Sequence, residues 1–64
     1  MKAEITESTF FKTWSYMIAG IRIRKHKGIN TFYPYELMEQ AASGCWKSIK
    51  KFHTLKEAKE YAGV

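Results

Sequence analysis

The spacing of apolar residues between residues 9 and 27 fits two different structures. The large apolar side chains recur at helical spacing, at Phe10, Phe11, Trp14, Met17, Ile18 and Ile21. The residue types favour a strand instead, because most are aromatic or β-branched, and Gly20 would interrupt a helix. We therefore predict a long bent strand, or two strands turning at Gly20, with a helix as the alternative.

The strand interpretation requires one irregularity near Gly20. Four apolar residues before it share one face of a strand: Phe10, Trp14, Tyr16 and Ile18. Ile21 and Ile23 have the opposite parity, and one extra residue at the glycine, as in a β-bulge, returns both to that face. Arg22 and Arg24 would then point away from the core.

Residues 25–44 read as a turn, a short strand and a short helix. Glycine and asparagine make residues 25–30 a turn. Residues 31–35 follow as a strand that Pro34 confines to an edge or ends. Residues 35–42 are strong helix formers, so they predict a two-turn helix, which Gly44 ends. The alternative is that the strand continues into a hairpin.

The last third of the chain predicts a strand that runs into a helix. Residues 46–52 contain β-forming anchors, but Ile49 breaks their alternation. Thr54 is a predicted N-cap and Glu57, three residues later, completes a capping box. Leu55, Ala58, Tyr61 and Ala62 form the predicted buried stripe. Gly63 ends the helix.

These elements predict one small α+β domain over residues 1–64, with residues 1–8 as a tail or a short edge. A chain of this length forms at most one domain with a small core. We expect a three-stranded antiparallel sheet, a C-terminal helix packed on one face, and a short middle helix at 35–42.

The charge distribution sharpens the functional prediction. The net charge is +5, and residues 8–35 and 40–56 contain no acidic residue. Such uncompensated basic segments indicate a polyanion partner or an acidic protein surface. The alternative is that the lysines serve solubility and guard sheet edges.

If the strands are neighbours, two basic clusters could line one sheet face and bind phosphates. Their members are Arg22, Arg24, Lys25, Lys27, Lys47, Lys50 and Lys51. Interleaved rings could stack on bases. The candidate rings are Tyr33, Tyr35 and Trp46.

Groups for catalysis are scarce. The chain has no aspartate and two histidines, and its glycines are isolated. Cys45 could act as a nucleophile with His26 or His53 as base, but we favour a buried or half-buried structural thiol. Glu36 and Glu39 could pair on the predicted helix, although a solvated helix face is the preferred interpretation. We expect a non-enzymatic protein with no cofactor and no metal.

The final segment resembles known proteins in the pattern Trp46-x-Ser48-Ile49-Lys50-x-Phe52-x-Thr54-Leu55-x-Glu57-Ala58-Lys59-x-Tyr61. It resembles the strand-into-helix ending of small proteins of bacteriophages and mobile elements. It is also similar to the end of the arm-site DNA-binding domain of tyrosine integrases. That resemblance implies a three-stranded sheet that enters the DNA major groove, with Arg22, Arg24, Lys47, Lys50 and Lys51 as its basic residues. The middle helix at 35–42 departs from the family pattern.

We therefore expect a partner that is nucleic acid, DNA rather than RNA, or an acidic surface of a host protein. In the second case the chain would modulate a host protein or a defence complex, as anti-restriction or anti-CRISPR proteins do. The N-terminus lacks a signal-peptide pattern and no segment approaches a membrane span. We expect a cytoplasmic monomer or homodimer, in a host cell if the chain is phage-encoded.

Overall fold

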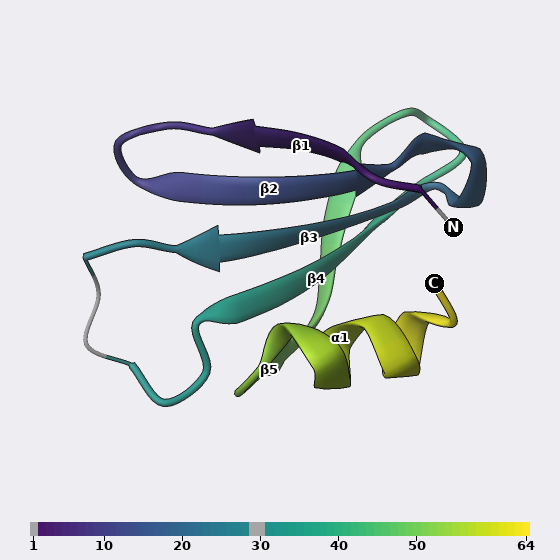
Figure 1. Ribbon diagram of the computed structural model, residues 1–64. Helices are drawn as coiled ribbons and strands as arrows, with labels where there is room; N and C mark the ends of the chain where they lie inside the picture. The colour runs from purple at the N-terminus through teal and green to yellow at the C-terminus, as the bar shows by residue number, and fades with distance from the viewer. Residues whose placement is uncertain (1, 29–30) are drawn as a thin grey trace.

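The computed structural model describes residues 2–28 and 31–64, and within them the chain forms an antiparallel meander followed by one α-helix (Figure 1). The strands are β1 (Glu4–Glu7), β2 (Phe11–Tyr16), β3 (Ile21–His26), β4 (Tyr35–Gln40) and β5 (Trp46–Phe52). A short 3-10 turn, η1 (Met17–Ala19), joins β2 to β3, and α1 (Leu55–Ala62) follows β5. The strand order in the sheet is β1-β2-β3-β4-β5, so β3 is the central strand.

The predicted three-stranded sheet with a middle helix is wrong, although the α+β class fits broadly. Residues 35–40, assigned to the middle helix, form β4, which pairs with β3 and β5. Helix propensity is a weak prior, and it is overridden here because Leu37 lies in the core with only 2% of its surface exposed. The continuation into a hairpin, considered as the alternative, is what the structure contains.

The ends of the predicted strands also differ. Residues 4–7 of the predicted tail or edge form β1, an edge strand paired with β2. Residues 31–34 lie outside the sheet, and β4 begins directly after Pro34, which has no N–H to donate to a ladder. Its carbonyl accepts a hydrogen bond from the N–H of His26 at 3.0 Å. Residues 29 and 30 of the predicted turn lie outside the described residues.

Residues 9–27 contain two strands that turn at Gly20, and the helical alternative is wrong. Gly20 has φ 66°, a left-handed conformation that glycine adopts readily. Its N–H donates to the carbonyl of Met17 at 3.1 Å, which closes η1. The turn resets the alternation, so Tyr16 pairs with Ile21.

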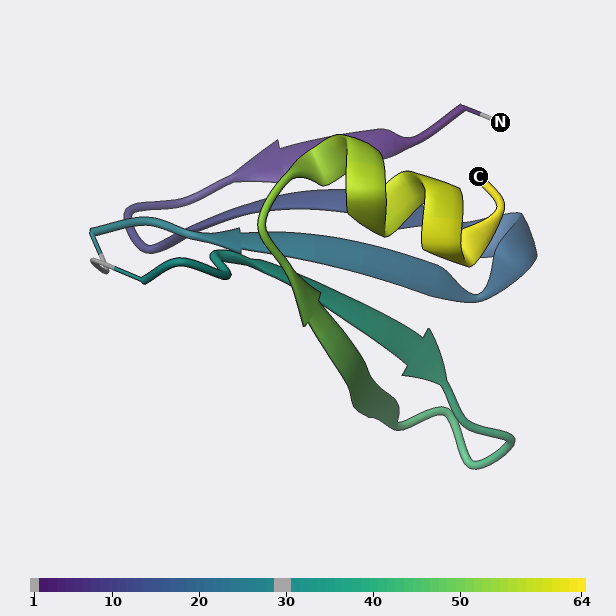
Figure 2. The same cartoon turned by 90° about the horizontal axis from the view of Figure 1, so that it is seen from below.

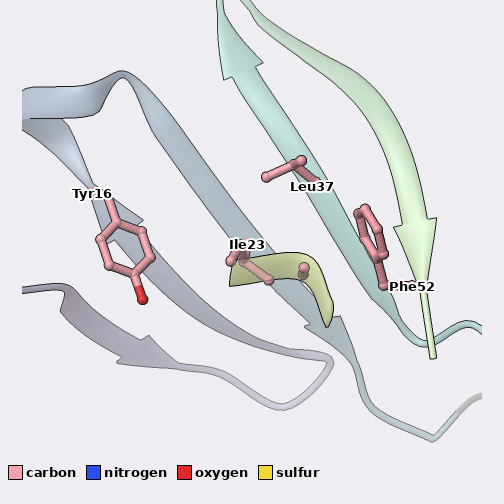
Figure 3. Packing of buried hydrophobic residues seen from close by; sticks show 5 residues of the cluster. Tyr16, Ile23, Leu37 and Phe52 are labelled. Atoms are coloured by element: carbon pink, nitrogen blue, oxygen red, sulfur yellow. The ribbon is translucent and has the colours of Figure 1, made fainter. Parts of the chain in front are cut away.

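The core lies between α1 and one face of the sheet (Figure 2). It consists of Tyr16, Ile23, Leu37, Phe52 and Ala58. Figure 3 shows the four sheet residues of this cluster, one each from β2, β3, β4 and β5. Ile23 on the central strand is completely buried, so β3 is fixed by its neighbours on both sides and by the helix.

The strand and the capped helix predicted for residues 46–62 are both present. The Thr54 hydroxyl accepts from the N–H of Glu57 at 3.2 Å and donates to its carboxylate, also at 3.2 Å. The Glu57 carboxylate thus meets the Thr54 hydroxyl rather than the Thr54 backbone N–H, so only the Thr54 half of the predicted capping box is seen among the described residues. Gly63 ends α1 in a left-handed conformation. Within the predicted stripe, Ala58 is buried, whereas Tyr61 is 59% exposed and packs its ring 5.3 Å from that of Phe52.

Ile49 is the extra residue of a β-bulge. Leu37 pairs with Lys50 and Met38 pairs with Ser48, so Ile49 has no partner on β4. This explains the break in alternation seen in the sequence. None of the described helices has the length and apolar character that crossing a membrane requires.

Candidate nucleic-acid interface

One face of the sheet carries no helix, and we call it the open face. Successive residues of a strand point to opposite sides, so the residues that alternate with the core residues lie on this face. They are Glu4, Thr6, Phe11, Thr13, Ser15, Arg22, Arg24, His26, Glu36, Met38, Gln40, Trp46, Ser48 and Lys51. The open face therefore combines hydroxyl groups, rings and cations.

Arg22 and Arg24 lie at its centre, because both belong to β3. The guanidinium carbon of Arg22 lies 4.2 Å from the centre of the Trp46 ring. That of Arg24 lies 4.6 Å from the centre of the Phe11 ring. Stacking on a ring attracts the cation and fixes the plane of the guanidinium. Rings from β5 and β2 thus hold the two arginines from opposite sides of β3.

Both arginines keep unused hydrogen-bonding capacity. The Nε atoms of Arg22 and Arg24 are buried, and neither has a hydrogen-bond partner among the described residues. Neither side chain takes part in the ion pairs found in the described part of the chain. A guanidinium offers five N–H donors. The one on each buried Nε is covered by the protein, so the four on the terminal nitrogens are those that can bind an anion.

A hollow of about 490 Å³ lies beside these arginines. Its lining consists of Glu4, Thr6, Thr13, Ser15, Met17, Arg22 and Arg24. Ser15 pairs with Arg22 and Thr13 pairs with Arg24 across β2 and β3. The hydroxyl groups therefore lie next to the cations, an arrangement suited to phosphate oxygens, which accept from both.

Glu36 is the acidic residue nearest the centre of this face. It pairs with Arg24 on β3 and with Lys51 on β5. His26 Nε2 lies 3.2 Å from its carboxylate. Burial alone would raise the pKa of Glu36, but hydrogen bonds from Ser48 and His26 and the charges of His26 and Arg24 hold that pKa below its usual value. Glu36 is therefore ionised at neutral pH and lowers the net positive charge of the face.

The structure splits the predicted basic clusters. Only Arg22, Arg24 and Lys51 reach the open face. The remaining four predicted basic residues lie elsewhere: Lys25, Lys27, Lys47 and Lys50. The bulge at Ile49 puts Lys47 and Lys50 on the side of α1, where Lys47 pairs with Glu39.

The remaining two lysines have partners of their own. Lys25 holds its Nζ 5.7 Å from the Tyr35 ring, on the helix side. Lys27 forms an ion pair with Glu7, and that pairing lowers the pKa of the Glu7 carboxyl. These contacts remove Lys25 and Lys27 from the open face.

The predicted stacking rings are likewise separated. Trp46 is on the open face, but Arg22 occupies its ring. Tyr35 faces the core, with its ring 6.2 Å from that of Trp14. Tyr33 is 52% exposed in the segment before β4 and contacts Phe32 edge to face. The three rings therefore do not form one platform.

The sequence prediction missed the polar and aromatic residues that surround the arginines. Phe11, Thr13 and Ser15 come from β2, and Ser48 comes from β5. A signal was present, since Thr13 and Ser15 alternate with Trp14 and Tyr16. Once β2 is recognised as a strand with one buried face, its polar half defines part of the opposite face.

The structure also shows where the candidate catalytic residues lie. Cys45 is exposed, so the expectation of a buried or half-buried thiol is wrong. Glu36 and Glu39 are three apart on a strand rather than a helix, which puts them on opposite faces. Among the described residues, no three His, Cys, Asp or Glu side chains form a group that could hold a metal ion.

Comparison with known proteins returned no significant match to a protein-family model, a curated protein or a solved structure. The chemistry of the open face consists of two ring-stacked arginines, a neighbouring lysine, four hydroxyl groups and one central carboxylate.

Proposed function

We propose that the protein is a non-enzymatic nucleic-acid-binding protein that holds double-stranded DNA against the open face. The observation that carries this proposal is the pair of arginines on the central strand. Each is stacked on a ring, and neither is neutralised by an ion pair among the described residues. Held guanidinium groups recognise phosphate through parallel hydrogen bonds and guanine through two acceptors of its major-groove edge.

The hydroxyl groups support phosphate contact as well. Most protein–DNA hydrogen bonds go to the sugar–phosphate backbone, and Ser and Thr side chains are common donors. Thr13 and Ser15 flank the arginines on one side, and Ser48 lies beyond Met38 on the other. A strand surface of this kind can enter a DNA groove, as β-ribbon proteins do.

The rings favour a duplex over a single strand as the ligand. Proteins that bind single strands offer aromatic faces on which unpaired bases stack. On the open face, Trp46 and Phe11 are half-buried and already stack on guanidinium groups. Their role is then to orient the arginines toward a phosphate backbone.

The expected binding is modest and strongly dependent on salt. With Arg22, Arg24 and Lys51 as the cations in contact, the log–log salt slope should be about −3, at roughly −0.9 per phosphate neutralised. Binding without sequence preference at physiological salt typically falls between about 10⁻⁴ and 10⁻⁶ M.

The experiment is an anisotropy titration of a labelled duplex of about 20 base pairs, at roughly 50 and 200 mM salt. The double variant Arg22→Gln/Arg24→Gln should lose binding and most of the salt slope. The control Lys47→Gln/Lys50→Gln removes the same charge from the helix side and should bind nearly as well as the parent. Equal loss in both variants, or no binding by the parent at low salt, contradicts the proposal.

A second candidate function is binding to a protein surface. Phe32 is 66% exposed, stacks on His53 with ring centres 4.3 Å apart, and contacts Tyr33 edge to face. Exposed aromatic clusters are typical of the residues that dominate protein interfaces. Stoichiometric, nuclease-insensitive recovery of one protein, abolished by Phe32→Ala but not by the arginine variant, would favour this function.

A further inference from the structure

The turn between β2 and β3 exposes apolar side chains. Ile18 is 98% exposed and Met17 is 57% exposed. Single exposed apolar residues are ordinary on protein surfaces. Here, however, two large ones are adjacent at the tip of a connection between β2 and the central strand. Ile18 makes almost no contribution to the core, so its apolar surface is available to a ligand.

The turn is closed by one hydrogen bond and anchored to β4 by another. The N–H of Gly20 donates to the carbonyl of Met17 at 3.1 Å within the turn. The carbonyl of Gly20 accepts from the N–H of Gln40 on β4 at 3.0 Å. The β-branched side chain of Ile18 has few rotamers of its own. The tip is thus an apolar projection whose base is anchored to β4 at Gly20.

The tip is continuous with the open face. Met17 lines the same hollow as Arg22 and Arg24. Met17 and Ile18 also border a second hollow, of about 260 Å³, together with Lys2, Glu4, Ser15 and Tyr16. Glu4 lines both hollows and is the acidic group in each. A ligand bound to the arginines would therefore meet the apolar tip at one end of its contact surface.

We propose that Met17 and Ile18 form a wedge that inserts between base pairs of the bound duplex and bends it. This inference rests on the proposed function. Proteins that bend DNA combine cationic contacts to the backbone with Ile, Met, Leu or Phe side chains that enter a base step and partly unstack it. The adjacent arginines supply the cationic contacts, and the exposed Ile18 is of the required type.

The test is the end-to-end distance of a duplex of about 20 base pairs, labelled at both ends and measured by energy transfer in the complex. The parent protein should shorten this distance by about 4 Å or more, which for a duplex about 68 Å long corresponds to a kink of at least about 40°. The variant Ile18→Ala should still bind, within about threefold of the parent, and leave the duplex straight. The variant is expected to fold, because the side chain it shortens is 98% exposed.

The matched control is Ile5→Ala. Ile5 is 56% exposed, and it pairs with Trp14 on the side of the sheet opposite the open face. This variant should bend the duplex as the parent does. Binding by the parent without bending, or full bending by Ile18→Ala, overturns the wedge and leaves the proposed function standing. Absence of binding at low salt overturns both.

A membrane-directed role for the tip is tested by a second measurement, of binding to vesicles. Vesicles of phosphatidylcholine and phosphatidylserine in equal parts provide the probe. Binding to these vesicles that requires Ile18, together with a straight duplex in the parent complex, would overturn the wedge.

Discussion

The guanidinium of Arg22 on β3 stacks on the ring of Trp46 on β5, with its central carbon 4.2 Å from the ring centre. The two strands are not neighbours, because β4 lies between them. The side chain of Arg22 therefore crosses over β4, where Met38 is its paired residue. This contact thus joins β3 to β5 across β4, and it fixes the orientation of the Arg22 guanidinium at the centre of the open face.

Replacing Trp46 with leucine should separate orientation from charge. Trp46→Leu keeps every cation but removes the ring on which Arg22 stacks. A cation–π contact of this kind contributes about 0.5 to 2 kcal/mol, so duplex affinity should fall several-fold and the free energy of unfolding should fall by about 1 kcal/mol. Anisotropy titration and urea unfolding measure the two effects.

The variant Trp46→Phe retains an aromatic face and is the matched control for Trp46→Leu. It should recover most of the affinity. If leucine and phenylalanine give the same affinity as tryptophan, the stacked orientation of Arg22 has no role in binding.

Neutralising Glu36 should strengthen DNA binding. The carboxylate lies between Arg24 and Lys51 in the strand register, and its lowered pKa keeps it charged at neutral pH. Glu36→Gln should therefore raise duplex affinity several-fold at low salt, with a smaller gain at high salt. Glu39→Gln, which removes the same charge from the opposite face, should change the affinity less. Equal gains in both variants would point to net charge rather than to the open face.

The same carboxylate should make stability depend on pH. The pKa of Glu36 is lower in the folded protein than its ordinary value of 4.5. Its contribution to stability is therefore complete above that value and is lost as the pH falls through the folded pKa. The free energy of unfolding of the parent should fall more steeply below about pH 5 than that of Glu36→Gln. Parallel curves for the two proteins would show that Glu36 contributes no such linkage.

The helix cap provides a prediction about stability alone. Thr54→Ala removes the side chain that caps α1, and such losses cost about 1 kcal/mol. Urea unfolding should show this decrease in the free energy of unfolding, whereas Thr9→Ala, in the exposed β1–β2 connection, should show little change. Similar values for the two variants would mean that the cap is replaced by water without loss.

The success of the sequence predictions followed the strength of the local signals. The capped helix was predicted correctly, because Thr54, Glu57 and Gly63 each act within a few residues of the chain. The turn at Gly20 was also predicted. Residues 35–40 were not, because their helix-forming side chains lie between two strands whose pairing is set by the rest of the fold. Only that pairing shows that Leu37 faces the core.

At the candidate site, too, local sequence predicted some positions, whereas others depended on how the strands pair. That Arg22 and Arg24 point away from the core follows from their alternation with Ile21 and Ile23. The positions of the lysines on β5 depend on the bulge at Ile49, which reverses the parity of Lys47 relative to Lys51. Sequence spacing alone suggested a break at Ile49, but it could not assign each lysine to a face.

The central claim concerns Arg22 and Arg24, which are the chain's two arginines. Their Nε–Hε groups therefore give two side-chain signals in a ¹⁵N-correlated NMR spectrum, and titration with a short duplex at low salt reports on both directly. The account predicts that both signals shift in a saturable manner and return as salt is added. Saturable binding of the duplex with both signals unmoved would contradict the account.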